Sequence, residues 1–223
     1  MERTIRVTGK GKISVKPDMI RLRITQEAVE RTYEGAILES ADKKGNLSDA
    51  LSKIGFKREE LKTLYFNVDT EYESYRDKQD CWRRRLVGYK YTHRMKLEFP
   101  ADNEILGRVL GVLVKCPGKP EFSIEYTIAN PEASKNELLG NAVADSKAKA
   151  EVLTKAAGVS LKDIQTIDYS WGEIEFVTRP INDMMLGECC EASMAKESTF
   201  VDLDIEADDI DVTDTVTVVW TIE

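Results

Sequence analysis

The chain has 223 residues, of which 42% are hydrophobic and 32% are charged, and its formal net charge at pH 7 is −8. This is enough apolar material for the core of one large domain or two small ones. The negative charge argues against a nucleic-acid partner, because phosphate binding needs a cationic surface. No apolar run approaches the ~18 residues that a transmembrane helix needs, so no membrane span is predicted.

The N-terminal segment MERTIRVTGKGKISV alternates in polarity as a strand does, and it has no apolar region of the kind found in a secretory signal. We therefore expect a soluble, cytoplasmic protein. Its GKGK stretch, residues 9–12, shares the composition of a phosphate-binding loop. Such a loop is followed by a helix, whereas residues 13–15 continue the strand. The glycines instead predict a hairpin turn or a bulge.

Five further segments alternate between apolar and polar residues, which is typical of half-buried strands. They are residues 20–28, 64–68, 87–99, 122–128 and 212–222. The longest, 87–99, places the only histidine, His93, on the same face as Tyr91 and Met95. Strands of this length with one polar face favour a large antiparallel sheet.

Three segments have the helical period. Apolar residues recur every three or four positions over residues 33–54 and again over 130–157. In the second segment Asn130 is suited to cap the helix and Pro131 to its first turn. A shorter and more apolar helix is predicted from Asp102 to about Lys115, and its composition indicates that it is well buried.

Two related stretches lie at the ends of the two long helices. IGFKREELKTLYF occupies residues 54–66 and AGVSLKDIQTIDY occupies 157–169, and each has a Gly where a left-handed helix cap belongs, at Gly55 and Gly158. In both cases a strand precedes the helix and another follows it. We interpret this as two related strand-helix-strand units, at about 18–99 and 120–222, within one sheet and one domain that covers 1–223. The predicted fold class is α+β, with two long helices and one shorter helix on a mainly antiparallel sheet.

The segment 176–211 has no clear period and is predicted to be a long insertion loop. Its acidic end lacks the central Gly and closing Glu of a calcium loop, so it is interpreted as a solvated charge run. Within the loop, Cys189 and Cys190 are a candidate redox pair, and the alternative is two thiols without function. No C-x-x-C spacing occurs, so neither a metal nor a cofactor is predicted.

Two other features are candidate sites. Trp82, Arg83, Arg84 and Arg85 form a basic and aromatic cluster, preceded by Tyr72, Tyr75 and Asp77, and it is the best candidate interaction surface. The alternative is a solvent-facing hairpin tip whose charges pair with the protein's own carboxylates. His93 is a candidate ligand or proton-transfer residue, and the favoured alternative is a histidine packed among strand side chains with one polar partner. No catalytic residue is assigned.

Four blocks of sequence resemble the SIMPL-domain family of bacterial proteins. They are TIRVTGKGKISVKPDMIRLRI, LVGYKYTHRMKLEF, NAVADSKAKAEVLTKAAGVSLKDI and VTDTVTVVWTI, in that order from Thr4 to Ile222. The resemblance implies an α+β domain and homo-oligomerisation, because some bacterial members resemble ring-like or channel-like assemblies. It supplies no established catalytic residues. Many members resemble exported envelope proteins, and here this chain departs from the family pattern because it shows no signal segment.

Two functional hypotheses follow. The first is a non-enzymatic oligomeric assembly or protein-interaction module, which the long strands and the absence of a recognisable catalytic motif favour. The second is a small-ligand sensor or enzyme whose site lies between the sheet and the 176–211 loop.

Overall fold

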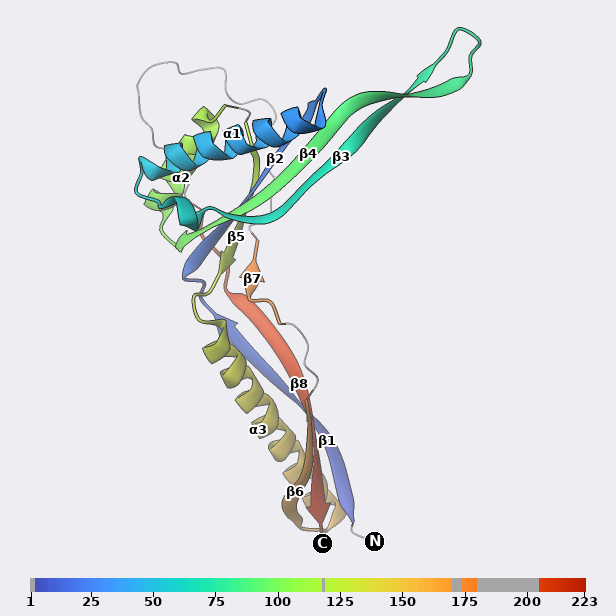
Figure 1. The fold of residues 1–223 in the computed structure, drawn as a ribbon. Coiled ribbons are helices and arrows are strands. Elements are labelled where there is room, and N and C mark those ends of the chain that lie inside the picture. The colour runs from blue at the N-terminus through green and yellow to red at the C-terminus, as the bar shows by residue number, and fades with distance from the viewer. Residues whose placement is uncertain (1–2, 118, 170–173, 180–204) are drawn as a thin grey trace. The chain divides into compact units, whose positions relative to one another are not determined.

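The computed structural model describes residues 3–117, 119–169, 174–179 and 205–223 (Figure 1). The chain forms two compact units. Unit 1 comprises Met1–Asp18, Thr127–Thr178 and Ala207–Glu223, and unit 2 comprises Met19–Tyr126 and Arg179–Glu206. Helices and antiparallel strands occur together, so the α+β class predicted from the sequence is confirmed.

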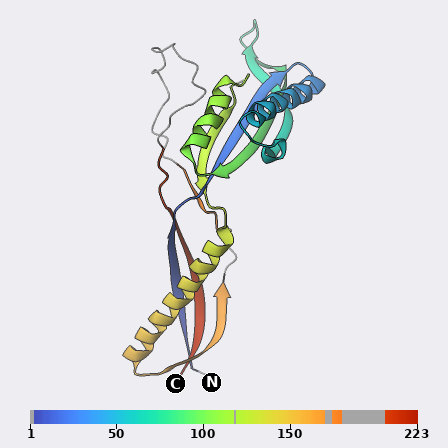
Figure 2. The same ribbon diagram turned by 90° about the vertical axis from the view of Figure 1, so that its left-hand side faces the viewer.

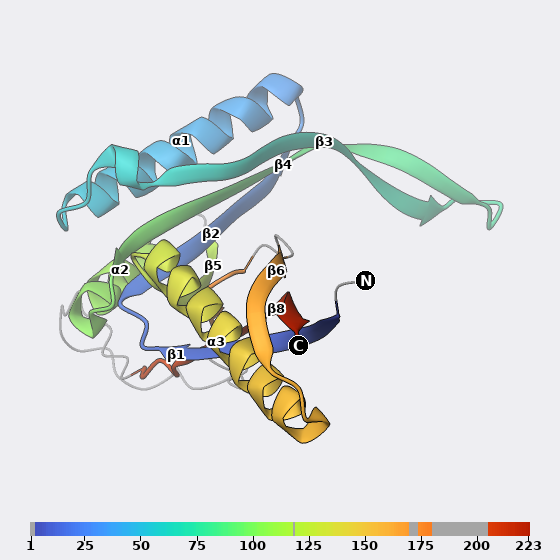
Figure 3. The same ribbon diagram turned by 90° about the horizontal axis from the view of Figure 1, so that it is seen from below.

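Unit 1 contains a three-stranded antiparallel sheet with the order β1-β8-β6. Strand β1 (Thr4–Val15) pairs along its whole length with β8 (Ile210–Ile222), and β6 (Leu161–Tyr169) pairs with the other edge of β8. Helix α3 (Pro131–Ala157) lies over these strands, as Figures 2 and 3 show from two directions. Unit 1 also contains the two-residue strand β7 (Val177–Thr178).

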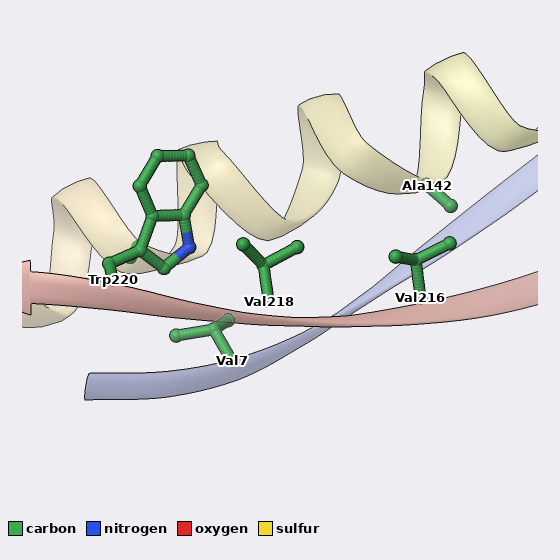
Figure 4. Close-up of a cluster of buried hydrophobic side chains, with 6 residues drawn as sticks. Val7, Ala142, Val216, Val218 and Trp220 are labelled. Carbon is green, nitrogen blue, oxygen red and sulfur yellow. The ribbon is translucent and has the colours of Figure 1, made fainter. Parts of the chain in front are cut away.

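The core of unit 1 lies between the sheet and α3. Val7 of the edge strand β1 is paired with Val218 of the central strand β8, and both side chains are buried with Ala142 of the helix (Figure 4). Towards one end of the same strands a second buried cluster contains Ile13, Ile128, Leu138, Phe176, Ile210 and Val212. Side chains from alternate positions of the strands therefore pack against one face of α3 along the length of the unit.

The GKGK segment forms neither a turn nor a bulge, so that prediction is wrong. Residues 9–12 lie inside β1, where each pairs in continuous register with β8. Glycine is needed there because α3 passes very close: a Cβ atom on Gly9 would lie 1.9 Å from the Ala142 carbonyl oxygen, and one on Gly11 would lie 2.2 Å from that of Leu138. Close backbone approach, rather than a special dihedral angle, explains these glycines.

The predicted cap of α3 is confirmed at both ends. The Asn130 side chain accepts a hydrogen bond from the Ala133 amide, and Gly158 ends the helix in the left-handed conformation, at φ 70° and ψ 28°. Helix α1 (Tyr33–Ser52) ends differently, because its C-cap is Lys53 in a right-handed conformation. Gly55 lies in the turn that follows, with φ 106°. The two stretches thus share a Gly of positive φ but not the same cap.

Unit 2 contains the remaining long strands and two helices on one face of their sheet (Figure 1). Strands β3, β4, β2 and β5 lie in that order, and the β3–β4 and β4–β2 pairs are antiparallel. Their bounds are β2 Met19–Glu30, β3 Lys62–Arg76, β4 Trp82–Pro100 and β5 Glu121–Thr127. Helix α1, the buried helix α2 (Asn103–Lys115) and the short 3₁₀ helix η1 (Arg58–Glu60) also belong to this unit.

The largest buried side chains of unit 2 come from alternate positions of β2 and β4 and from the two helices. They include Ile20, Leu22, Ile24, Tyr91, Met95, Leu97, Leu47, Leu51, Leu106 and Val109. Helix α2 begins where the sequence predicts, with the Asp102 side chain accepting hydrogen bonds from the amides of Glu104 and Ile105 at 2.7 and 3.3 Å. In the described ranges no helix is long and apolar enough to cross a membrane.

The strands form two sheets rather than the one sheet expected. Strand β2, helix α1 and strand β3 of the first predicted strand-helix-strand unit lie together in unit 2. In the second predicted unit, α3, β6 and β8 lie in unit 1, whereas the strand that precedes α3, β5, lies almost wholly in unit 2. The internal repeat and its boundaries remain a prediction. Most of the predicted insertion loop, including residues 180–204, lies outside the described residues.

Candidate functional site

His93 lies on β4 beneath α1, and 6% of its surface is exposed. Its Nδ1 atom is 3.0 Å from the hydroxyl of Ser40 on α1, and its Nε2 atom is 2.9 Å from the hydroxyl of Thr63 on β3. The ring of Phe66 packs edge-on against the imidazole, with the centroids 5.2 Å apart. Both ring nitrogens therefore have partners within the fold.

The surroundings keep this histidine neutral. Burial, together with the nearby positive charge of Lys44, lowers the pKa of His93 below its ordinary value of 6.5. The ammonium group of Lys44 donates to Thr63 Oγ1 at 3.2 Å, which leaves the Thr63 hydroxyl proton available to His93 Nε2. In that arrangement Nδ1–H donates to Ser40. The geometry fits a structural link between α1, β3 and β4 better than a ligand site.

The Trp82–Arg85 cluster lies in the outer part of the β3–β4 hairpin, which we name the hairpin arm and define as residues 72–87. Figures 1 and 3 show this part of the hairpin extending past the end of α1. Strand β2 ends at Glu30, which pairs with Tyr89, so no third strand from the described part of the chain lies beside the arm. All of its residues are exposed except Asp77, which is half-buried.

The strand register divides the cluster between the two faces of the arm. Arg84 pairs with Ser74 and Trp82 pairs with Arg76, so Trp82 and Arg84 share a face. Tyr72 and Leu86 belong to the same face, which we name the aromatic face and define by Tyr72, Ser74, Arg76, Trp82, Arg84 and Leu86. The guanidinium of Arg84 lies over the Tyr72 ring at 4.9 Å, and that of Arg76 over the Trp82 ring at 5.0 Å.

Arg83 and Arg85 lie on the opposite face, and their charges are matched within the arm. Arg83 Nε is 2.9 Å from Asp77, and Arg85 forms an ion pair with Glu73. The hydrogen bond from Arg83, followed by those from the amides of Cys81 and Gln79, lowers the pKa of Asp77. Arg84 has no ion pair with any described residue. The four residues named from the sequence are therefore not one basic patch.

The sequence did not identify Arg76 and Leu86 as members of this surface. Both lie outside the run Trp82–Arg85, and only the pairing of β3 with β4 places them beside Trp82 and Tyr72. The signal in the sequence is the pair of aromatic residues before the turn, Tyr72 and Tyr75, of which only Tyr72 belongs to the aromatic face. Reading it requires the cross-strand register, which the bulge at Glu71/Tyr72 shifts by one residue.

The remaining predicted site lies outside what the structure describes. Cys189 and Cys190 fall within 180–204, so their prediction as a redox pair stays untested. Cys81, exposed in the arm, and Cys116, buried after α2, are free thiols. Burial raises the pKa of Cys116, which keeps that thiol protonated. Among the described residues no group of three or more His, Cys, Asp or Glu side chains is placed to hold a metal ion.

These features define the class as an α+β protein that presents an exposed aromatic and arginine-rich arm. The model of the SIMPL family, described as proteins of unknown function (DUF541), matches residues 5–220, so the chain belongs to this family. The family resemblance predicted from the four sequence blocks is confirmed.

Two curated proteins are similar to this chain in sequence. The chain is 27% identical over 157 residues to a 26 kDa periplasmic immunogenic protein of Brucella melitensis biotype 1, covering 70% of this chain and 62% of that protein. It matches the protein of the same name from Brucella abortus strain S19 with the same identity and coverage. The alignment thus spans a little under two thirds of the length of these relatives.

Proposed function

We propose that this protein is a non-enzymatic, homo-oligomeric interaction module and that the hairpin arm makes the principal contact between copies. The observation that supports this proposal most directly is the composition of the arm. An isolated two-stranded ribbon is marginally stable in water, yet this one carries large side chains that the chain itself leaves exposed. Trp82 is 67% exposed, and Tyr72 and Leu86 are each 46% exposed.

The chemistry of the aromatic face suits a protein partner. Tyr, Trp and Arg are the residues enriched at protein interfaces, and contiguous exposed apolar surface marks binding sites. The cation–π contacts of Arg76 and Arg84 hold the two aromatic rings in place before binding, which reduces the entropy lost on association. A second copy presents the same face and so supplies an equivalent set of aromatic groups for an isologous contact.

Unit 1 offers a separate apolar surface that supports the same proposal. Val152 and Leu153 of α3 are 69% and 51% exposed, and they border a hollow of about 380 Å³ with Val7 and Ala148. On β6, Ile164 and Ile167 are also largely exposed. Two apolar surfaces in one chain are expected of an assembly that has more than one kind of contact.

Sedimentation velocity over a range of micromolar concentrations tests the proposal. We expect the wild-type chain to sediment as an oligomer, and Tyr72→Ser/Trp82→Ser to shift the distribution towards the monomer. Because both side chains are exposed, the loss of their two cation–π contacts should cost no more than about 2 kcal/mol of unfolding free energy, so the variant should remain folded. Val114→Ser is the matched control, since Val114 is an apolar α2 residue that is 69% exposed but lies outside the arm.

Two results would contradict the proposal in different ways. If the wild-type chain stays monomeric at every concentration, the proposed homo-oligomer is contradicted. If Tyr72→Ser/Trp82→Ser forms the same oligomer as the wild type, oligomerisation is supported but the arm is not the principal contact between copies.

The cytoplasmic location expected from the sequence stays a prediction. The two Brucella relatives are named as periplasmic proteins, which favours the cell envelope instead. Cell fractionation of the full-length protein distinguishes these compartments. The ligand-sensor alternative also stays a prediction, because most of the 176–211 loop on which it depends lies outside the described residues.

A further inference from the structure

The first half of helix α1, residues 33–44, packs on the sheet of unit 2 with few large apolar side chains. The buried residues of α1 are Ala36, Ser40, Leu47, Ser48 and Leu51. Only Ala36 and Ser40 belong to the first half, so burial of this half contributes little hydrophobic free energy. Its attachment to the sheet therefore depends on specific polar and aromatic contacts.

Two of these contacts involve tyrosines of β4. Tyr33 packs edge-on against Tyr89, with the ring centroids 5.9 Å apart. The ammonium of Lys43 lies 5.6 Å from the centroid of the buried Tyr91 ring. Contacts of these kinds are each worth only about 1 kcal/mol, so they do not hold the helix half in place by themselves.

The other contacts all pass through His93. Ser40 lies 3.0 Å from its Nδ1 atom, and Lys44 donates at 3.2 Å to Thr63, whose hydroxyl lies 2.9 Å from its Nε2 atom. One imidazole thus connects two positions of the first half of α1 to both β3 and β4.

A proton on His93 disturbs this connection in two ways. In the neutral form the Thr63 hydroxyl donates to Nε2, whereas protonation makes Nε2 a donor and deprives that hydroxyl of its acceptor. Protonation also places a positive charge in a buried site close to the ammonium of Lys44. Both effects favour any conformation in which the imidazolium reaches water.

The side chains that face His93 offer no negative charge to compensate. They are Gln26, its partner on β2, Thr63 and Phe66 of β3, and Tyr91 and Met95 on the same face of β4. On α1, the carboxylate of Glu39 is engaged with Lys43 at 3.2 Å. Within the described residues, Lys44 is the charged group that acts on His93.

We propose that His93 is an acid-sensitive switch: when it takes up a proton, residues 33–44 detach from the sheet while residues 45–52 stay in place. Leu47 and Leu51 anchor the second half. Gly45 lies between the halves with open space around it, and glycine is the residue at which a helix is most easily interrupted short of proline. Detachment uncovers Tyr91 and His93, so unit 2 presents a surface in mild acid that is covered at neutral pH.

This inference does not rest on the proposed function, because every contact that it uses lies inside one copy of unit 2. Local detachment also costs less than unfolding the unit, since the large apolar side chains remain buried. A helix as short as residues 33–44 is marginal in water without its packing surface. Detachment should therefore break the hydrogen bonds of its backbone as well.

Hydrogen exchange measured by NMR at pH 7.5 and pH 5.5 tests the proposal. The probes are the amides of residues 37–44, because the first four amides of a helix have no acceptor within it. We expect their protection factors, which already correct for the intrinsic effect of pH, to fall about tenfold, since a histidine pKa of about 6.5 governs the open form. The amides of residues 49–52 and those of α3 should change by less than about twofold.

His93→Gln is the decisive variant, because glutamine keeps a neutral side chain with a donor and an acceptor but cannot take up a proton. His93 is the only histidine of the chain, so no second imidazole titrates in this range. The protection factors of residues 37–44 in this variant should be equal at the two pH values. Arg94→Gln, at the next residue of β4 and exposed, is the matched control and should keep the wild-type fall.

The proposal is overturned if the wild-type protection factors of residues 37–44 do not change between the two pH values. It is also overturned if residues 49–52 or α3 lose as much protection, because the loss then reports unfolding of more than the first half of α1. Both results come from the wild type and hold even if His93→Gln does not fold. A full wild-type fall in a folded His93→Gln protein would exclude His93 as the responsible group.

Discussion

Gly9 of β1 lies so close to Ala142 of α3 that a Cβ atom on the glycine would be 1.9 Å from the alanine carbonyl oxygen. The same Cβ would lie 2.5 Å from the Ser146 amide nitrogen. Since both obstacles are backbone atoms of a long helix, no side-chain rotation can relieve the overlap. The contact fixes how close helix and sheet lie along the middle of unit 1.

Gly9→Ala should therefore destabilise unit 1 by more than about 3 kcal/mol, because the helix must move off the sheet. Urea unfolding followed by circular dichroism measures this change. Gly140→Ala is the matched control on α3: a Cβ there meets nothing within 4 Å, and it should stabilise the helix by about 0.8 kcal/mol. Equal effects of the two substitutions would contradict the close-packing explanation.

His93 predicts a loss of stability on mild acidification. Its folded-state pKa is lowered, so below pH ~6.5 the unfolded chain takes up a proton that the folded chain does not. As the pH falls from 7 towards 5, the free energy of unfolding should decrease by up to about 1.4 kcal/mol per pH unit, until the folded-state pKa is reached. His93→Gln should remove this slope.

Urea unfolding at closely spaced pH values checks that expectation. Carboxylates whose pKa is lowered by ion pairing, such as Asp77 and Glu27, lose their contribution only below about pH 5 and so do not obscure it. An identical slope in wild type and His93→Gln between pH 7 and 5 would show that His93 is not the responsible group.

Asp102 supplies a test of the α2 terminus. Its carboxylate accepts from two amides of the first turn, so Asp102→Ala should cost about 1 kcal/mol of stability. Asp42→Ala, which removes the same side chain from an exposed position of α1, should change stability by less than about 0.5 kcal/mol. Thermal unfolding compares the two, and an Asp102→Ala protein as stable as wild type would exclude a capping role.

Gly158 and Gly45 are expected to respond to alanine in opposite directions. Gly158 has a left-handed conformation, so Gly158→Ala should cost about 1 kcal/mol. Gly45 lies inside α1 with open space around it, so Gly45→Ala should stabilise by about 0.8 kcal/mol. Chemical denaturation of both variants measures the signs, and a stabilised Gly158→Ala protein would contradict the assigned cap.

The individual elements of this fold were predictable because each has a strong local signal. Alternation from Val87 to Phe99 and the Asn130-Pro131 start of α3 both correspond to elements of the structure. The division into two sheets was not predictable in the same way. Alternation indicates which face of a strand is buried but not which strand lies beside it. Strand β1 accordingly gave no sign that its partner is β8.

The candidate sites show the same limit. The Trp82–Arg85 run was visible as a cluster, yet its division between two faces depends on pairing with β3. Gly9 was misinterpreted because turns and close backbone contacts both select glycine, and only the position of α3 distinguishes them.

The pairing of β1 with β8 also sets an order of events during synthesis. Residues 19–126 contain the helices and long strands that the structure describes in unit 2, so that unit can fold once they have left the ribosome. Strand β1, by contrast, cannot pair until β8 has been synthesised, because Thr4 pairs with Thr221 and Val15 with Ile210. Until then β1 keeps an open edge and the apolar face of α3 has no complete sheet to cover. A nascent chain arrested before residue 210 would therefore have a folded unit 2 and an incomplete unit 1. The unpaired edge of β1 and the uncovered apolar face of α3 could then bind chaperones or other nascent copies.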